Sequence, residues 1–155
     1  MSRTAIVKSV TDVTPNMRRI VFGGPGIADF PPKHDGGYIK LIFPDLPRVK
    51  PDRPVMRTYS VRHHDPAAGE IAVDFAMHDD TGGIALEWAS GAQPGDAMLL
   101  SGPGSVKMAP PDADWYLIAA DMTGLPAAMC NLERLPATAR GYAVFEIPTD
   151  AARQP

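Results

Sequence analysis

The sequence is poor in the features that mark secreted, membrane-spanning and nucleic-acid-binding proteins. It has one cysteine, Cys130, in 155 residues, so it can form no internal disulfide and offers no cysteine-based zinc cluster. No apolar run approaches the length of a membrane span, and the first residues lack the apolar core of a signal peptide. The formal net charge of −3 gives no general attraction to nucleic acid or anionic lipid. We therefore expect a cytoplasmic protein that binds neither nucleic acid nor membrane.

Proline and glycine, in contrast, are frequent. The chain has 17 prolines and 14 glycines, whereas its apolar content of 45% and charged content of 21% are close to those of average globular domains. These averages exclude an intrinsically disordered or collagen-like chain. The frequent turn residues favour short strands joined by many turns over long helices.

Six short strands are predicted in the first two thirds of the chain. Alternating or clustered apolar residues, separated by turns that contain Pro or Gly, occur at 4–13, 17–22, 38–43, 55–61, 70–77 and 97–100. One short helix is expected at residues 84–90, directly after a pair of glycines. Six short strands with one small helix indicate a closed antiparallel barrel rather than a stack of βαβ units.

The pattern changes after the Pro-rich stretch at residues 103–114. Residues 115–120 form a nearly continuous apolar run, typical of a strand that is buried on both faces. Apolar side chains at helical spacing predict a helix over 124–135, and residues 142–147 predict a second apolar strand. This βαβ unit is the start of a doubly wound α/β domain.

The two patterns divide the chain into a barrel domain at residues 1–110 and an incomplete α/β domain at residues 111–155. A lone βαβ unit leaves apolar strand faces and backbone edges without a cover. The barrel, a second copy of the chain or a continuation of the doubly wound domain would supply one. We therefore expect residues 115–147 either to associate with another copy, as a homo-oligomer, or to be partly disordered.

The most informative segment is the predicted strand Arg57-Thr58-Tyr59-Ser60-Val61-Arg62. Because side chains alternate along a strand, Arg57 and Tyr59 share a face, where a cationic fork beside a flat aromatic can hold a phosphate and a planar ring together. The hydroxyl and amide of Ser60 can hydrogen-bond the heteroatoms of such a ring. Taken alone, this short pattern more often marks a half-buried strand with a solvated arginine and a core tyrosine.

The neighbouring motifs favour the functional interpretation of this segment. A strand that ends Asp74-Phe75-Ala76-Met77-His78 is followed by the pair Gly82-Gly83, which opens a helix and offers backbone amides at its positive end, a natural seat for a pyrophosphate. The motifs Pro94-Gly95-Asp96, Gly102-Pro103-Gly104 and Asp121-Met122-Thr123-Gly124 follow in that order. This ordered set, over residues 10–146, resembles the FAD-binding domain of the siderophore-interacting protein family, within the ferredoxin–NADP⁺ reductase superfamily.

The resemblance implies a mostly β fold, a six-stranded antiparallel Greek-key barrel that binds FAD, followed by the start of a Rossmann-like NAD(P)H-binding domain. It implies FAD-dependent reduction of Fe(III) in ferric siderophores, with electrons from NAD(P)H or a ferredoxin-like protein and with no catalytic acid, base or metal ligand. Residues 148–155 are a polar tail, whereas the family continues past this point, so most of the nicotinamide site is expected to be missing. Two alternatives stay open, a module that binds flavin or ferric siderophore without turnover and a plain structural barrel.

The resemblance also assigns the cofactor site. Arg57 would bind the pyrophosphate or ribityl region, Tyr59 would pack on the isoalloxazine, and Ser60 would lie near its redox-active edge. The full set of implied cofactor-binding residues is Arg57, Thr58, Tyr59, Ser60, Asp74, Phe75, His78, Gly82, Gly83, Ile84, Ala85 and Thr123. The run from Gly82 to Ala85 departs from the Gly-Pro-Ala-Ser of the family, which removes one hydroxyl donor to the phosphates.

Three basic residues, Arg48, Lys50 and Arg53, lie in the Pro-rich loop just before the informative strand. They are either a cationic rim that attracts an anionic ferric siderophore or part of a solvated loop, and the sequence favours neither. His63 and His64 are adjacent on a predicted strand, so their side chains diverge and cannot chelate one metal ion. Cys130 lies on the apolar side of the predicted helix, as expected of a packing residue.

Overall fold

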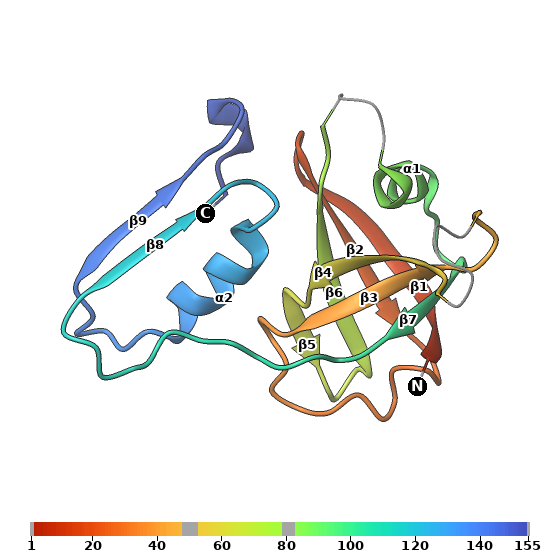
Figure 1. The fold of residues 1–155 in the computed structure, drawn as a ribbon, viewed down its shortest axis with the longest axis horizontal. Coiled ribbons are helices and arrows are strands. Elements are labelled where there is room, and N and C mark those ends of the chain that lie inside the picture. Colours follow the sequence, from red (N-terminus) through yellow and green to blue (C-terminus); the bar gives the residue numbers. More distant parts are fainter. Residues whose placement is uncertain (1, 48–52, 79–82, 155) are drawn as a thin grey trace.

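The computed structural model describes residues 2–47, 53–78 and 83–154. Its main feature is a seven-stranded antiparallel sheet with the strand order β4-β3-β7-β1-β2-β6-β5. The strands are β1 (Ser2–Thr14), β2 (Met17–Gly23), β3 (Tyr38–Phe43), β4 (Val55–Ser60), β5 (His63–Asp65), β6 (Glu70–Ala76) and β7 (Ala97–Ser101). The sheet curls so that β4 contacts β6 across its open side (Figure 1). The mostly β, antiparallel fold is therefore confirmed.

One strand was not predicted, so the count of six becomes seven. The predicted strand at 55–61 ends at Ser60, because the backbone of Val61 bonds instead to Gly36 and Gly37. The chain then turns, and the three residues of β5 pair with β6 in an antiparallel hairpin. So short a strand, made of two histidines and an aspartate, has no apolar alternation by which it could be recognised.

The barrel core is filled by the inward-facing half of each strand. Phe22, Phe75 and Ile20 are completely buried, as alternation along β2 and β6 requires. The helix α1 (Ile84–Gly91) covers one end and buries Ala85 and Ala89, which lie four residues apart on one helix face. The ring of Trp88 stacks on Phe22 with centroids 6.0 Å apart, so this tryptophan belongs to the core.

A second, smaller unit follows an extended connection from β7 to β8 (Figure 1). The strands β8 (Tyr116–Ala120) and β9 (Gly141–Phe145) are parallel and are joined by α2 (Leu125–Arg134), and a 3₁₀ turn, η1 (Asp150–Ala152), follows. The predicted βαβ unit is thus confirmed. Gly141 is required by the close approach of the strands, because a Cβ there would lie 2.0 Å from the carbonyl oxygen of Tyr116. The domain boundary between residues 110 and 111 falls in the connection and stays a prediction.

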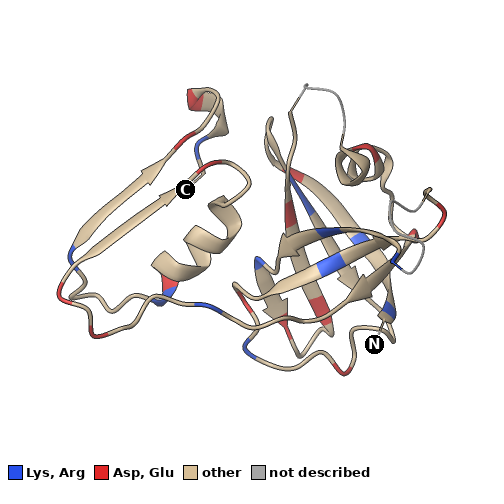
Figure 2. Ribbon diagram, in the orientation of Figure 1, with Lys and Arg blue, Asp and Glu red and all other residues tan. Residues whose placement is uncertain are grey.

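The expectation that β8 and β9 are buried on both faces is wrong for the described residues. The helix α2 lies between the two-stranded sheet and the barrel, so it covers one face only (Figure 1). Neither strand contains a charged residue, and both are uniformly tan in Figure 2. The other face carries Trp115, Leu117, Tyr142 and Val144, among which Leu117 is 61% and Tyr142 71% exposed. We call these four residues the outer apolar face.

We predict that the protein self-associates through the outer apolar face, because exposed apolar patches on this scale mark contact surfaces. A Leu117→Lys/Val144→Lys variant is expected to sediment as a monomer at concentrations where the unmodified chain associates. An Ala67→Lys/Ala68→Lys variant, altered on the exposed β5–β6 turn, is the control and is expected to associate normally. A monomeric unmodified chain with full hydrogen-exchange protection over residues 115–147 would contradict the prediction.

Candidate flavin site at the junction of barrel and helix

A pocket of about 240 Å³ opens where β4 and β6 of the barrel face the start of α2. Its lining residues are Thr58, Tyr59, Ser60, Asp74, Ala76, Thr123 and Pro126. A second pocket of about 480 Å³ adjoins it and shares Ala76 and Thr123. The rest of its lining is Asn16, Met77, His78, Met122, Glu146, Ile147 and Pro148. The two pockets make a cleft between the barrel and the carboxyl ends of β8 and β9.

Tyr59 forms the aromatic part of the first pocket. It lies opposite Ile39 in the β3–β4 ladder, while Arg57 lies opposite Leu41, so the two share a face of β4 as predicted. The ring of Tyr59 rests on that of Phe75, with centroids 4.4 Å apart and planes 37° apart. Burial raises the pKa of the Tyr59 phenol, although the charge of Arg57 opposes this. The phenol is therefore neutral, and its ring is held in place at the pocket.

Arg57 is an exposed cation beside this aromatic. Its guanidinium donates to the carbonyl oxygen of Met56 at 2.9 Å, and within the described residues no carboxylate is paired with it. Since a guanidinium has five N–H donors, most of those of Arg57 can still donate to an anion. Arg57 does not line the 240 Å³ pocket, whereas Thr58 and Ser60 do, so β4 presents its hydroxyls to the pocket and its cation next to it.

The residues predicted on β6 have different surroundings. Asp74 lines the pocket, but its carboxylate is buried and bonds the guanidinium of Arg19 at 2.7 and 2.8 Å. Phe75 is completely buried beneath Tyr59, so its side chain supports the tyrosine and does not line the cleft. His78 follows the strand, is exposed and lines the second pocket.

The start of α1 has the backbone geometry expected of an anion seat. Gly83 precedes the helix with extended backbone, and its carbonyl oxygen accepts from the amides of Leu86 and Glu87 at 2.8 and 3.0 Å. No side chain caps the helix, so its first amides have no partner within it. Ile84 is half-buried and Ala85 buried, which leaves their backbone as the part that can bind phosphate. Gly82 lies outside the described residues.

Thr123 lines both pockets from the second unit. Its hydroxyl donates to the carboxylate of Asp121 at 2.7 Å, and the amide of Gly124 donates to the same oxygen at 2.8 Å. The hydroxyl and amide bonds lower the pKa of Asp121, which stays ionised and fixes the loop. Pro126, in the first turn of α2, completes this wall. The wall therefore has a defined shape before any ligand arrives.

Some lining residues had no predicted role. Ala76 falls inside a quoted motif and Pro126 follows another by two residues, so the motifs themselves were the available signal. Asn16, Glu146 and Ile147 carry no such signal, because only the docking of the two units brings them to one cleft. Of the predicted basic rim, Arg53 is exposed, and Arg48 and Lys50 lie outside the described residues.

The described residues lack two further features. They hold no group of three or more histidine, cysteine or carboxylate side chains placed to bind a metal ion. Neither helix there has the length and apolarity that a membrane crossing requires.

A curled antiparallel sheet joined to a βαβ unit, with a cleft between them, defines the class of ferredoxin reductase-like flavoproteins. A ferredoxin–NADP⁺ reductase from Plasmodium falciparum shares this fold at 13% identity, with a TM-score of 0.69 over 99% of this chain and 64% of that one. The family model of the siderophore-interacting FAD-binding domain matches residues 6–52 and 47–107, and that of the siderophore-interacting protein matches residues 113–155. The chain belongs to the siderophore-interacting protein family.

Individual relatives agree with this assignment. Ferric vibriobactin reductase ViuB from Vibrio cholerae is 32% identical over 87% of this chain and 55% of its own length. The NADPH-dependent ferric-chelate reductase of Escherichia coli is 33% identical over 86% of this chain and 57% of its own. The crystal structure of the siderophore-interacting protein SipS from Aeromonas hydrophila is 37% identical, with a TM-score of 0.85 over 99% of this chain and 62% of that one. The chain thus spans little more than half the length of these curated relatives.

The residues present fit FAD, the cofactor of this domain. The neutral, supported ring of Tyr59 suits a planar ring system, and three hydroxyls at Thr58, Ser60 and Thr123 line the same pocket. Arg57 is an exposed cation on the strand that lines the pocket, as a phosphate partner requires. Gly83, Ile84 and Ala85 at the start of α1 line neither pocket, and their role in binding phosphate stays a prediction.

Proposed function

We propose that this chain uses FAD to reduce Fe(III) held in a ferric siderophore, with NAD(P)H as the electron donor. The observation that carries the proposal is the pocket in which Tyr59 and Ser60 of the barrel face Thr123 of the second unit. Its aromatic and hydroxyl lining matches the demands of a flavin ring. The names of the ferric vibriobactin and ferric-chelate reductases support the substrate class, and the second of these names supports the donor.

When bound, FAD supplies the electron transfer, and the protein supplies binding and orientation. In this proposal Tyr59 packs on the ring, and the hydroxyls of Thr58, Ser60 and Thr123 bond its polar edge. Arg57 and the first amides of α1, at Gly83, Ile84 and Ala85, hold the pyrophosphate. At the iron, electron transfer breaks no bond to hydrogen, so no side chain need act as acid or base toward the substrate.

The second pocket offers part of a site for the donor. It lies at the carboxyl ends of two parallel strands, and ligands of open α/β sheets bind in the crevice outside these ends. Its polar side chains are Asn16 and His78 from the barrel and Thr123 and Glu146 from the second unit. We assign this pocket to the nicotinamide-bearing donor, which must approach the flavin ring through the shared wall at Thr123.

The test is electron transfer from the chemically reduced, FAD-loaded protein to a ferric siderophore without oxygen. We expect the flavin absorbance to return and an Fe(II) chelator to develop colour, both faster than with free reduced FAD. Addition of NADPH, NADH or a reduced ferredoxin to the oxidised protein then identifies the donor by bleaching. A protein that binds FAD but transfers no electrons to iron would be the non-catalytic module instead, and failure to bind FAD would overturn the site.

The basic rim gives a separate prediction. If Arg48, Lys50 and Arg53 attract an anionic ferric siderophore, the rate of its reduction should fall with salt, since exposed charges are screened over about 8 Å at physiological ionic strength. The triple alanine variant is expected to be slower at low salt and nearly insensitive to salt. Stopped-flow reoxidation of the reduced protein at several salt concentrations measures this. An equally large salt effect in the variant would exclude these residues from substrate binding.

A further inference from the structure

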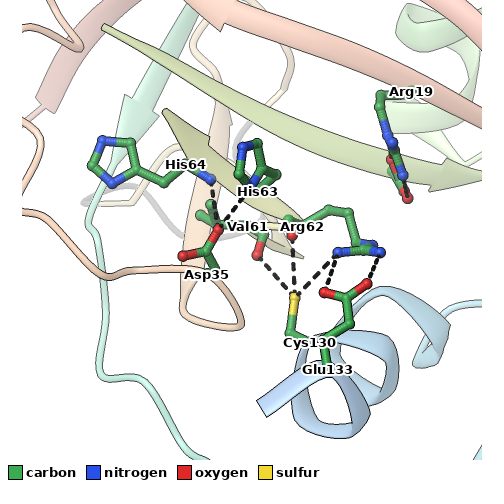
Figure 3. A network of polar contacts seen from close by, with 9 residues as sticks. Arg19, Asp35, Val61, Arg62, His63, His64, Cys130 and Glu133 are labelled. Carbon is green, nitrogen blue, oxygen red and sulfur yellow. Dashed lines mark hydrogen bonds and ion pairs between the residues drawn. The ribbon is translucent and has the colours of Figure 1, made fainter. Parts of the chain in front are cut away.

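Arg62, the last residue of the informative segment, has no part in the proposed flavin site. It lies just beyond β4, and its side chain is only 15% exposed. Its guanidinium donates to both carboxylate oxygens of Glu133 on α2, with one of the two distances 3.0 Å (Figure 3). Burial acts to lower the pKa of Arg62, but the bond to Glu133 and the negative charges of Glu133 and Asp74 together raise the pKa above its ordinary value. Arg62 is therefore a charged, bidentate link from the barrel to the second unit.

Cys130, one turn before Glu133, strengthens the same contact. Its thiol lies 3.2 Å from the carbonyl oxygen of Arg62 and 3.8 Å from that of Val61 (Figure 3). Burial raises the pKa of this thiol, so it is protonated and acts as a small packing group and weak donor. The end of α2 is thus seated directly on the backbone that follows β4.

Asp35 provides a third contact between the units. Its carboxylate accepts from Arg134 of α2 at 3.2 Å and from the backbone amide of His64 at 2.8 Å. Burial acts to raise the pKa of Asp35, but these bonds and charges keep it below its ordinary value, so the carboxylate is ionised. Three residues of one helix face, at 130, 133 and 134, therefore contact the barrel.

These contacts lie at the opposite end of α2 from the flavin pocket. The helix has 10 residues and is about 15 Å long at ~1.5 Å per residue. Its first turn supplies Pro126 and follows Thr123, whereas Glu133 lies in its last turn. On the barrel, Arg62 comes two residues after Ser60, which lines the facing wall. One ion pair therefore joins the last turn of α2, whose first turn lies at one wall of the pocket, to the residue two positions after Ser60 on the other wall.

The ion pair contributes orientation more than stability. Glu133 is 50% exposed, and ion pairs with one solvated partner add little to the free energy of unfolding. A bidentate arginine–carboxylate pair nevertheless fixes the relative direction of the two groups. A helix held in this way behaves as a rigid arm, so a small rotation at Glu133 displaces Thr123 from Tyr59.

We propose that Arg62 and Glu133 are positioning residues of the flavin site, whose ion pair sets the angle of α2 and so brings Thr123 and Pro126 up to Tyr59. This rests on the proposed flavin site. Neither residue touches the cofactor in this proposal. The ion pair instead determines how closely the second unit covers the flavin ring. It thereby affects the affinity for FAD and the asymmetry of the surroundings of the ring.

The test compares Arg62→Met and Glu133→Gln with the unmodified protein. We expect each to bind FAD about tenfold more weakly, a change of about 1.4 kcal/mol. The visible circular dichroism of the bound flavin should shrink and its fluorescence should rise, while the urea midpoint of unfolding changes little. The matched control is Arg3→Met, because Arg3 is 18% exposed and pairs with Asp29 at 2.6 Å away from α2. This control should keep the affinity and spectrum of the unmodified protein.

The double variant Arg62→Met/Glu133→Gln decides whether the two residues act as a pair. Members of one interaction are not additive, so the double variant should bind FAD as weakly as either single variant. Additive losses, or unchanged affinity and dichroism in Arg62→Met, would overturn the proposal. Tyr59→Ala is measured alongside: unchanged FAD binding in that variant would mean that the flavin site itself is wrong. A loss in Tyr59→Ala with none in Arg62→Met would contradict the positioning role alone.

Discussion

Replacing Tyr59 with alanine is expected to weaken FAD binding about tenfold to a hundredfold, which corresponds to roughly 1–3 kcal/mol for a desolvated aromatic that packs on a ring. The physical reason is that Tyr59 is already half-buried and supported by Phe75 before any ligand binds. Little side-chain freedom is then lost on binding, so most of the contact appears as affinity. Arg57→Ala should weaken binding by a similar factor, because it removes the exposed cation beside the pocket.

Titration of the apoprotein with FAD, followed by quenching of flavin fluorescence, measures both effects. Tyr142→Ala is the matched aromatic control, since Tyr142 is exposed on the outer apolar face, and Arg140→Ala is the control for charge. Both controls should bind FAD like the unmodified protein. Unchanged affinity in both Tyr59→Ala and Arg57→Ala would show that the flavin binds elsewhere.

Most strands of the barrel could be predicted from the two-residue alternation of side chains along a strand. Alternation along β2 places Ile20 and Phe22 inside, and the structure buries both. Along β1 the structure instead buries Ala5 and Val7, whereas the larger side chains of Ile6, Val10 and Val13 are only partly buried. In β6 every residue from 71 to 75 is buried. The same rule predicted that Arg57 and Tyr59 share a face, and the β3–β4 register agrees. The apolar runs of β8 and β9 could not indicate whether both faces of this sheet are covered, because that depends on what packs against the sheet.

The cleft was less predictable, because it forms only when the two units meet. Tyr59 and Thr123 are 64 positions apart in sequence, and neither strand nor helix periodicity indicates that they line one pocket. The family resemblance of their motifs was the signal that assigned both to one cofactor site. The partner of Asp74 was likewise not predictable from the sequence around it. Its motif marked it as a cofactor residue, but its carboxylate is taken up by Arg19, which is 55 positions away and was not assigned a role.

The Arg19–Asp74 pair gives the second large expected effect. Asp74→Leu removes the buried carboxylate and leaves the guanidinium of Arg19, which is only 32% exposed, without its partner. Breaking one side of a buried ion pair costs about 3 kcal/mol or more, because the remaining charge is uncompensated. We expect a loss of about 3 kcal/mol in the free energy of unfolding, measured by urea titration with tryptophan fluorescence.

The double variant Arg19→Met/Asp74→Leu separates a structural role of Asp74 from a role in binding. Replacing both charges by apolar groups of similar size is often nearly neutral, so the double variant should regain most of the lost stability. Both carboxylate oxygens of Asp74 bond Arg19, so its charge is already compensated within the protein. We therefore expect the stable double variant to bind FAD within a small factor of the unmodified protein. If stability returns but FAD binding does not, the Arg19–Asp74 pair takes part in binding the cofactor, and the purely structural role given to it here is wrong.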